Sequence, residues 1–157
     1  MRLLVTTKSS RTARRTLQHQ YHIRAAPDRT FDAISRPEML VRWLADRAEL
    51  VPRKGGRYRL GWTDGPTHTG KVLDFEPGKR VVLEWSWPGV ALRGTEFRLS
   101  VEPKDGGSLL SIEHSGFPKL AKWTELYAGA EWGWTYFAMN LKSVLETGHD
   151  LRSRLDG

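Results

Sequence analysis

Two of the five histidines stand where an imidazole could do chemistry. His114 shares one side of the alternating segment SLLSIEHS with Leu110 and Ile112, so we expect it to face the interior. There it could orient a polar ligand group or act as a general base, or it could be a core histidine whose hydrogen bonds are satisfied within the protein. His68 follows a Gly-Pro turn and could lie at the mouth of a cavity or on an exposed loop.

Aromatic side chains are the other candidates, and the chain has seven tryptophans. Tryptophan and tyrosine combine a large apolar surface with a polar tip, which suits both cores and ligand pockets. Alternation along the strands and the helical period predict that many of them face one interior space, although each could simply fill the core. The predicted ligand-binding residues are Tyr58, Leu60, Trp62, Leu83, Trp85, Trp87, Phe97, Leu99, His114, Tyr127, Trp134, Phe137, Ala138 and Leu141.

Several other chemistries lack the residues they need. The chain has no cysteine, which excludes disulfides, thiolate catalysis and cysteine-ligated metals. No two histidines have the i, i+4 spacing of a helical metal site. No Gly-x-Ser-x-Gly elbow, phosphate loop or dinucleotide fingerprint is present. We therefore expect no metal, no nucleotide cofactor and no ATP hydrolysis.

The net charge of +7 comes largely from the N-terminal segment. Residues 1–16 hold five of the 25 basic residues and no acid, which leaves 20 basic against 18 acidic residues in the rest. This segment is expected to be a disordered basic arm or the product of a misassigned start, with a transit peptide or a nucleic-acid-binding arm as alternatives. Nucleic-acid binding is disfavoured because the body lacks a basic excess. No apolar run is long enough to span a membrane, and we expect a cytoplasmic protein.

The stretch from Thr124 to Asp150 predicts one long helix that must position many of these side chains. Thr124 is expected to cap its start, and Gly148 to take the left-handed position after its end. Gly129 and Gly133 each cost about 1 kcal/mol relative to alanine, so we expect them where the backbone passes close to a neighbour. The helix carries one apolar stripe that consists of Leu126, Tyr127, Ala130, Trp134, Phe137, Ala138, Leu141, Val144 and Leu145.

A second apolar stripe lies on the opposite side of this helix. Trp132, Tyr136 and Met139 follow one another at i, i+4, i+7 spacing and cannot face the same sheet as the first stripe. They are expected to pack against the N-terminal arm or a loop, or to form a dimer or protein-partner surface.

The chain before the helix predicts a sheet for it to cover. A strand over residues 17–25 is followed by two short helices, the first capped by Asp28 and the second opened by Pro37. Turn signals then separate five segments that are predicted to be strands, at 57–62, 67–75, 80–87, 94–102 and 108–115. No face can be assigned to 67–75, because Val72 and Phe75 fall on opposite sides. The expected fold is α+β: a curved antiparallel sheet of about six strands wrapped around the C-terminal helix.

In this arrangement the sequence resembles the START-like (SRPBCC) helix-grip superfamily, and within it the family of heat-shock-protein ATPase activator homologues. The resemblance runs from about Gln18 to Arg152. The residues that carry it are Ala26-Pro27, Phe31-Asp32-Ala33-Ile34, Pro37, Trp43-Leu44, Gly55-Gly56-Arg57-Tyr58, Gly70-Lys71-Val72, Glu76-Pro77, Lys79-Arg80-Val81-Val82, Trp85, Gly133-Trp134, Leu141-Lys142, Leu145-Glu146 and Gly148.

The resemblance implies a single domain over residues 17–157 that binds a small apolar or aromatic molecule between helix and sheet. The family takes its name from a co-chaperone, so a protein-interaction or chaperone-regulating module is one alternative, acting through Trp132, Tyr136 and Met139. A cyclase-, dehydratase- or hydrolase-type enzyme that uses the same cavity, with His114 or a residue at the mouth as acid or base, is the other. An enzyme is disfavoured because no second catalytic group is predicted beside His114.

Overall fold

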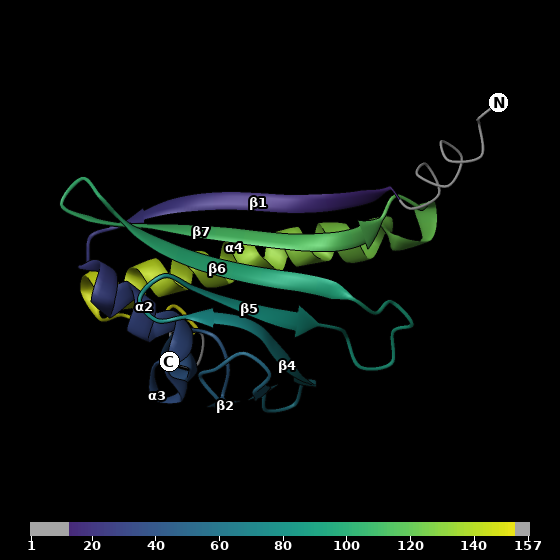
Figure 1. Ribbon diagram of the computed structural model, residues 1–157, viewed down its shortest axis with the longest axis horizontal. Helices are drawn as coiled ribbons and strands as arrows, with labels where there is room; N and C mark the ends of the chain where they lie inside the picture. The colour runs from purple at the N-terminus through teal and green to yellow at the C-terminus, as the bar shows by residue number, and fades with distance from the viewer. Residues whose placement is uncertain (1–12, 153–157) are drawn as a thin grey trace.

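The computed structural model describes residues 13–152, in which seven strands form one antiparallel sheet and α4 lies along one face of it (Figure 1). The strand order is β1-β7-β6-β5-β4-β3-β2, so only β1 is out of sequence order. The strands are β1 (Arg14–Ile23), β2 (Arg47–Leu50), β3 (Arg57–Gly61), β4 (Thr67–Glu76), β5 (Arg80–Trp85), β6 (Thr95–Lys104) and β7 (Gly107–Pro118). The predicted fold class is confirmed.

Two details of the sheet differ from the prediction. The short edge strand β2 was missed, because a polar–apolar alternation over only the four residues Arg-Ala-Glu-Leu is too short to predict a strand. Strand β1 starts at Arg14, so residues 14–16 belong to the sheet and not to the arm. The remainder of the predicted arm, residues 1–12, lies outside the described residues.

A β-bulge in β4 explains why this segment shows no single inward face. Val72 pairs with Leu83 and Asp74 pairs with Val82, so Leu73 is an extra residue opposite one step of β5. Such a bulge reverses which side chains face inward. Val72 is fully buried before it, and Phe75 after it packs partly against the same core.

The helices begin and end close to the predicted positions, but two predicted caps are wrong. Helix α2 spans Pro27–Ser35 and α3 spans Pro37–Trp43; a 3₁₀ turn at Ala121–Trp123 leads into α4, Thr124–Thr147. The N-cap residues of α2 and α4 are Ala26 and Trp123, without side-chain caps, so Asp28 and Thr124 lie inside their helices. Gly148 confirms the predicted end of α4, with φ of 80° and its N–H donating to the Val144 carbonyl at 2.9 Å.

The C-terminal end of α4 is anchored against α3. Asn140 is fully buried, and its amide donates to the carbonyl of Trp43 (3.0 Å) and to the carboxylate of Asp150 (2.9 Å). Its side-chain oxygen accepts from the backbone N–H of Leu151 at 2.7 Å. Figure 1 shows α2 and α3 beside this yellow end of α4. The anchored end fixes the direction in which the rest of the helix crosses the sheet.

None of the helices in the described part of the chain combines the length and apolarity that a bilayer crossing needs.

Candidate ligand cavity

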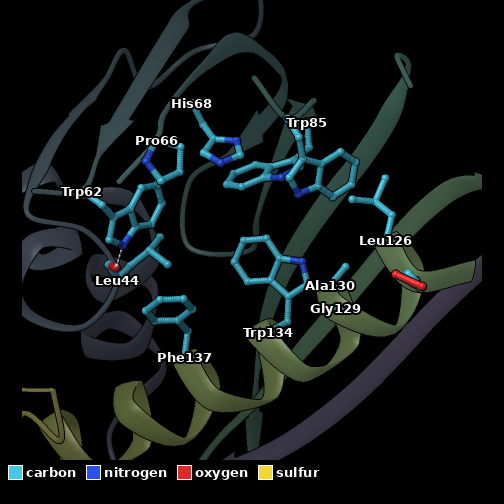
Figure 2. A pocket seen from close by; sticks show the side chains of 13 residues that line it. Leu44, Trp62, Pro66, His68, Trp85, Leu126, Gly129, Ala130, Trp134 and Phe137 are labelled. Carbon is cyan, nitrogen blue, oxygen red and sulfur yellow. Dashed lines mark hydrogen bonds between the residues drawn. The ribbon is translucent and has the colours of Figure 1, made fainter. Parts of the chain in front are cut away.

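A cavity of about 440 Å³ lies between the N-terminal half of α4 and strands β3 to β5 (Figure 2). The sheet side contributes residues from the β3–β4 turn, from β4, from the end of β5 and from the loop after it, and Leu44 comes from the C-cap of α3. The complete lining is Leu44, Trp62, Pro66, His68, Trp85, Trp87, Glu125, Leu126, Gly129, Ala130, Gly133, Trp134 and Phe137. The exposed Pro66, Glu125 and Gly129 mark the mouth.

Five of the fourteen predicted ligand-binding residues line this cavity: Trp62, Trp85, Trp87, Trp134 and Phe137. The other nine do not line it: Tyr58, Leu60, Leu83, Phe97, Leu99, His114, Tyr127, Ala138 and Leu141 pack in or against the surrounding core. Strand alternation and helical period identify the side of an element that faces inward. They do not say whether another side chain already fills the space opposite.

The residues that sequence reasoning missed come mainly from α4. Leu126 and Ala130 belong to the predicted stripe but were not among the predicted ligand-binding residues. Gly129 and Gly133 were expected at a close approach of two backbones, and this is wrong: a Cβ at either position would meet no atom within 4 Å. The two glycines instead leave open volume beside Ala130.

Packing holds the aromatic wall in place. Trp85 lies between Tyr58 (ring centroids 6.0 Å apart, planes at 10°) and His68 (4.5 Å, 24°). Trp134 stacks on Phe97 at 3.8 Å and meets Trp85 edge to face at 5.0 Å. Because each ring is held by neighbours on the protein side, the wall does not need a ligand to form.

Two of the wall indoles also use their N–H groups within the protein. Trp62 Nε1–H donates to the carbonyl of Leu44 at 2.8 Å (Figure 2). Trp134 Nε1–H donates to Nδ1 of His114 at 3.0 Å. These bonds fix the orientation of both rings and satisfy polar atoms that would be costly to bury alone.

His114 lies behind this wall and not in it. Because its Nδ1 accepts from Trp134, the proton of the neutral ring is on Nε2, which is buried and has no hydrogen-bond partner among the described residues. Trp87 covers the ring in a parallel stack at 5.6 Å. Burial lowers the pKa of His114 to about 3, so it is neutral at physiological pH. This position does not support the acid–base role considered for it.

His68 is the histidine that reaches the cavity. Its Nδ1 donates to the carbonyl of Ser86 at 2.9 Å, because a carbonyl can only accept. The His68 ring stacks on Trp85 and also meets Trp62 edge to face, with ring centroids 5.6 Å apart. Only 5% of His68 is exposed, and burial lowers its pKa despite the bond to Ser86. The neutral ring therefore presents Nε2 as an acceptor.

The cavity wall carries little charge. Glu125 is its only charged residue, and no lysine or arginine is among the lining. Within residues 13–152, no cluster of three or more histidine or acidic side chains is placed to hold a metal ion.

The second stripe of α4 lies outside the cavity. Trp132 is 72% exposed and stacks in parallel on Tyr136 with centroids 5.8 Å apart, and Met139 is 38% exposed. In the part of the chain that the structure describes, no loop covers these three side chains. The expectation that a loop packs on them is therefore wrong, whereas the arm lies outside the described residues.

A curved antiparallel sheet closed over one long helix, with a cavity between them, defines a helix-grip protein of the SRPBCC superfamily. The chain belongs to the family of activator of Hsp90 ATPase homolog 1-like proteins, whose sequence model matches residues 24–146. The predicted family is thus confirmed.

Solved structures agree with this assignment. A protein from Mesorhizobium loti has 26% identity and a TM-score of 0.76, with 86% of this chain and 99% of that chain covered. An AHSA1-like protein from Rhizobium etli has 25% identity and a TM-score of 0.68, with coverages of 86% and 84%. The Aha1 dimer from Colwellia psychrerythraea has 21% identity and a TM-score of 0.75, with coverages of 85% and 98%. No curated protein sequence matches the chain.

Proposed function

We propose that this protein binds a small apolar or aromatic molecule in the cavity between α4 and the sheet. The observation that carries this proposal is the cavity itself, whose volume of about 440 Å³ lies within the range typical of small-molecule sites. Its wall consists of four tryptophans, a phenylalanine and a histidine, together with the small residues Gly129, Ala130 and Gly133 of α4. Rings already held by packing lose little freedom on binding, which favours affinity.

Gly133 offers a way to test the proposal without damaging the wall. A leucine there begins with a Cβ in open space, so its side chain should fill the cavity while α4 keeps its contacts. Wild type and Gly133→Leu are screened by thermal shift against aromatic compounds, sterols and lipids. A ligand that raises the Tm of wild type should leave the Tm of Gly133→Leu unchanged.

The matched control is Thr135→Leu, which adds a leucine at an exposed position of the same helix. It should retain the full ligand-induced shift. A shift that persists in Gly133→Leu would place the ligand elsewhere. If no compound shifts wild type, the ligand-binding proposal itself is contradicted.

A second candidate function is self-association through the face formed by Trp132, Tyr136 and Met139. Its support is a flat pair of stacked rings with one ring 72% exposed, a surface that a second copy could cover. The Colwellia psychrerythraea relative is described as a dimer. Sedimentation velocity over a range of concentrations should show a dimer for wild type and a shift toward monomer for Trp132→Ala. An equal dimer fraction in both would contradict this face as the interface.

A further inference from the structure

His68 brings to the cavity an acceptor that makes no hydrogen bond within the described residues. His68 donates through Nδ1 to Ser86, which leaves the Nε2 lone pair as the free polar atom of a nearly buried ring. Figure 2 shows the ring reaching from β4 into the cavity, across from Trp134 and Phe137. No hydrogen bond to Nε2 is made within the described residues, so in an apolar site this atom lacks a partner.

The ring of His68 is held in one position. The Ser86 bond, the parallel contact with Trp85 at 4.5 Å and the edge contact with Trp62 at 5.6 Å fix it from three directions. A fixed acceptor distinguishes ligands more sharply than a mobile one, because it loses no freedom when it bonds and stays unpaired with a ligand that cannot donate.

The rest of the wall limits what else the ligand can carry. The ring faces of Trp134 and Phe137 favour a flat, apolar body. A carboxylate would find no lysine or arginine in the lining and would meet Glu125 at the mouth.

We propose that His68 selects the ligand: the cavity takes an uncharged, flat aromatic molecule whose hydroxyl or N–H donates a hydrogen bond to His68 Nε2. This inference rests on the proposed function, which states only that an apolar or aromatic molecule binds. It adds the polar group that the ligand must carry and the residue that recognises it.

Three naphthalene probes test this, because they share one flat body and differ in the polar group. 2-Naphthol can donate, 2-methoxynaphthalene can only accept, and 2-naphthoate carries a negative charge. Binding is followed by quenching of tryptophan fluorescence, since four tryptophans line the cavity. We expect 2-naphthol to bind wild type about tenfold more tightly than 2-methoxynaphthalene, as one buried hydrogen bond allows, and 2-naphthoate to bind most weakly.

His68→Phe is the decisive variant, because it keeps an aromatic ring against Trp85 but removes the acceptor. It should bind 2-naphthol and 2-methoxynaphthalene equally. The indole N–H groups of Trp85 and Trp87 have no acceptor among the described residues. A ligand oxygen that accepts from one of them is the alternative to a ligand that donates to His68. A wild type that does not prefer 2-naphthol, or a preference that survives in His68→Phe, would overturn the proposal.

A measurement on wild type keeps the test independent of whether the variant folds. In protein with ¹⁵N-labelled histidine, the proton of free His68 should be on Nδ1, and 2-naphthol should shift its Nε2 resonance while 2-methoxynaphthalene does not. An unmoved Nε2 resonance at saturating 2-naphthol overturns the selection by His68 but leaves the cavity as a binding site. If none of the probes, including unsubstituted naphthalene, binds, the proposed function fails with it.

Discussion

The two halves of α4 meet the same sheet with very different results. In the C-terminal half, the helix packs closely and its inward residues are buried: Ala138, Leu141, Val144 and Leu145. In the N-terminal half, Leu126 and Ala130 are only partly buried and line a cavity. One apolar stripe runs through both halves, so the helical period does not distinguish them.

The difference comes from side-chain size and from the elements that surround each half. Helices α2 and α3 pack beside the C-terminal half, and Asn140 ties it to the carbonyl of Trp43 and to the chain after the helix. The N-terminal half has the small residues Gly129, Ala130 and Gly133 in the cavity lining. Close packing therefore stabilises one half, while the other leaves space for a ligand.

Truncation of Leu141 should show the largest contrast between the halves. Leu141 has no exposed surface, so Leu141→Ala removes buried atoms and leaves a void, at a cost of about 3 kcal/mol in the free energy of unfolding. Leu126→Ala, on the cavity wall, should cost less than about 1 kcal/mol, since its neighbourhood is already partly empty. Urea denaturation of both variants measures this. Equal losses would mean that the two halves are packed alike.

The pH dependence of stability should reveal the histidine behind the cavity wall. Burial lowers the pKa of His114 from 6.5 to about 3. As the pH falls below 6.5, this histidine is therefore protonated in the unfolded chain but stays neutral in the folded protein. Stability is therefore highest above pH 6.5 and falls toward pH 3, by about 2 kcal/mol between pH 7 and 5. The free energy of unfolding is compared at the two values for wild type and His114→Gln.

The His114→Gln variant keeps an acceptor for the Trp134 N–H but does not titrate in this range. Its loss of stability between pH 7 and 5 should be about 2 kcal/mol smaller than that of wild type. If both proteins lose the same amount, His114 is more accessible to protons than its position indicates.

A substitution at Gly133 should have the smallest effect and the opposite sign. Gly133→Ala places a methyl group in open space and improves helix propensity, so it should raise the free energy of unfolding by about 1 kcal/mol. Gly148→Ala is the control: its φ of 80° is unfavourable for alanine, so that change should destabilise. Thermal denaturation distinguishes the two. A loss of stability in Gly133→Ala would mean that the space beside α4 is not open.

Local patterns predicted most of the fold. Alternation gave five of the strands, proline and glycine placed the short helices and the end of α4, and the order of the elements was enough for the fold class. The two predicted caps failed because Asp28 and Thr124 are good capping residues that lie one or more positions inside their helices. Strand β4 could not be assigned because a bulge at Leu73 changes its parity, and a single sequence does not mark such an insertion.

The candidate site was predicted less well than the fold. Trp62, Trp85 and Trp134 were expected at the cavity and are there, but Tyr58 and Phe97 have the same inward parity and form the layer behind. His114 looked like the interior histidine to consider, yet His68 is the one that lines the cavity.

The sequence by itself determined which residues face the interior of this protein, because a period of two or 3.6 residues is a property of neighbours along the chain. Only the tertiary structure decided where that interior is full and where it is empty. The empty volume depends on residues that come together from distant segments: Pro66 from the β3–β4 turn, His68 from β4, and Gly129 and Gly133 from α4. No local pattern records how well such segments fill the space between them.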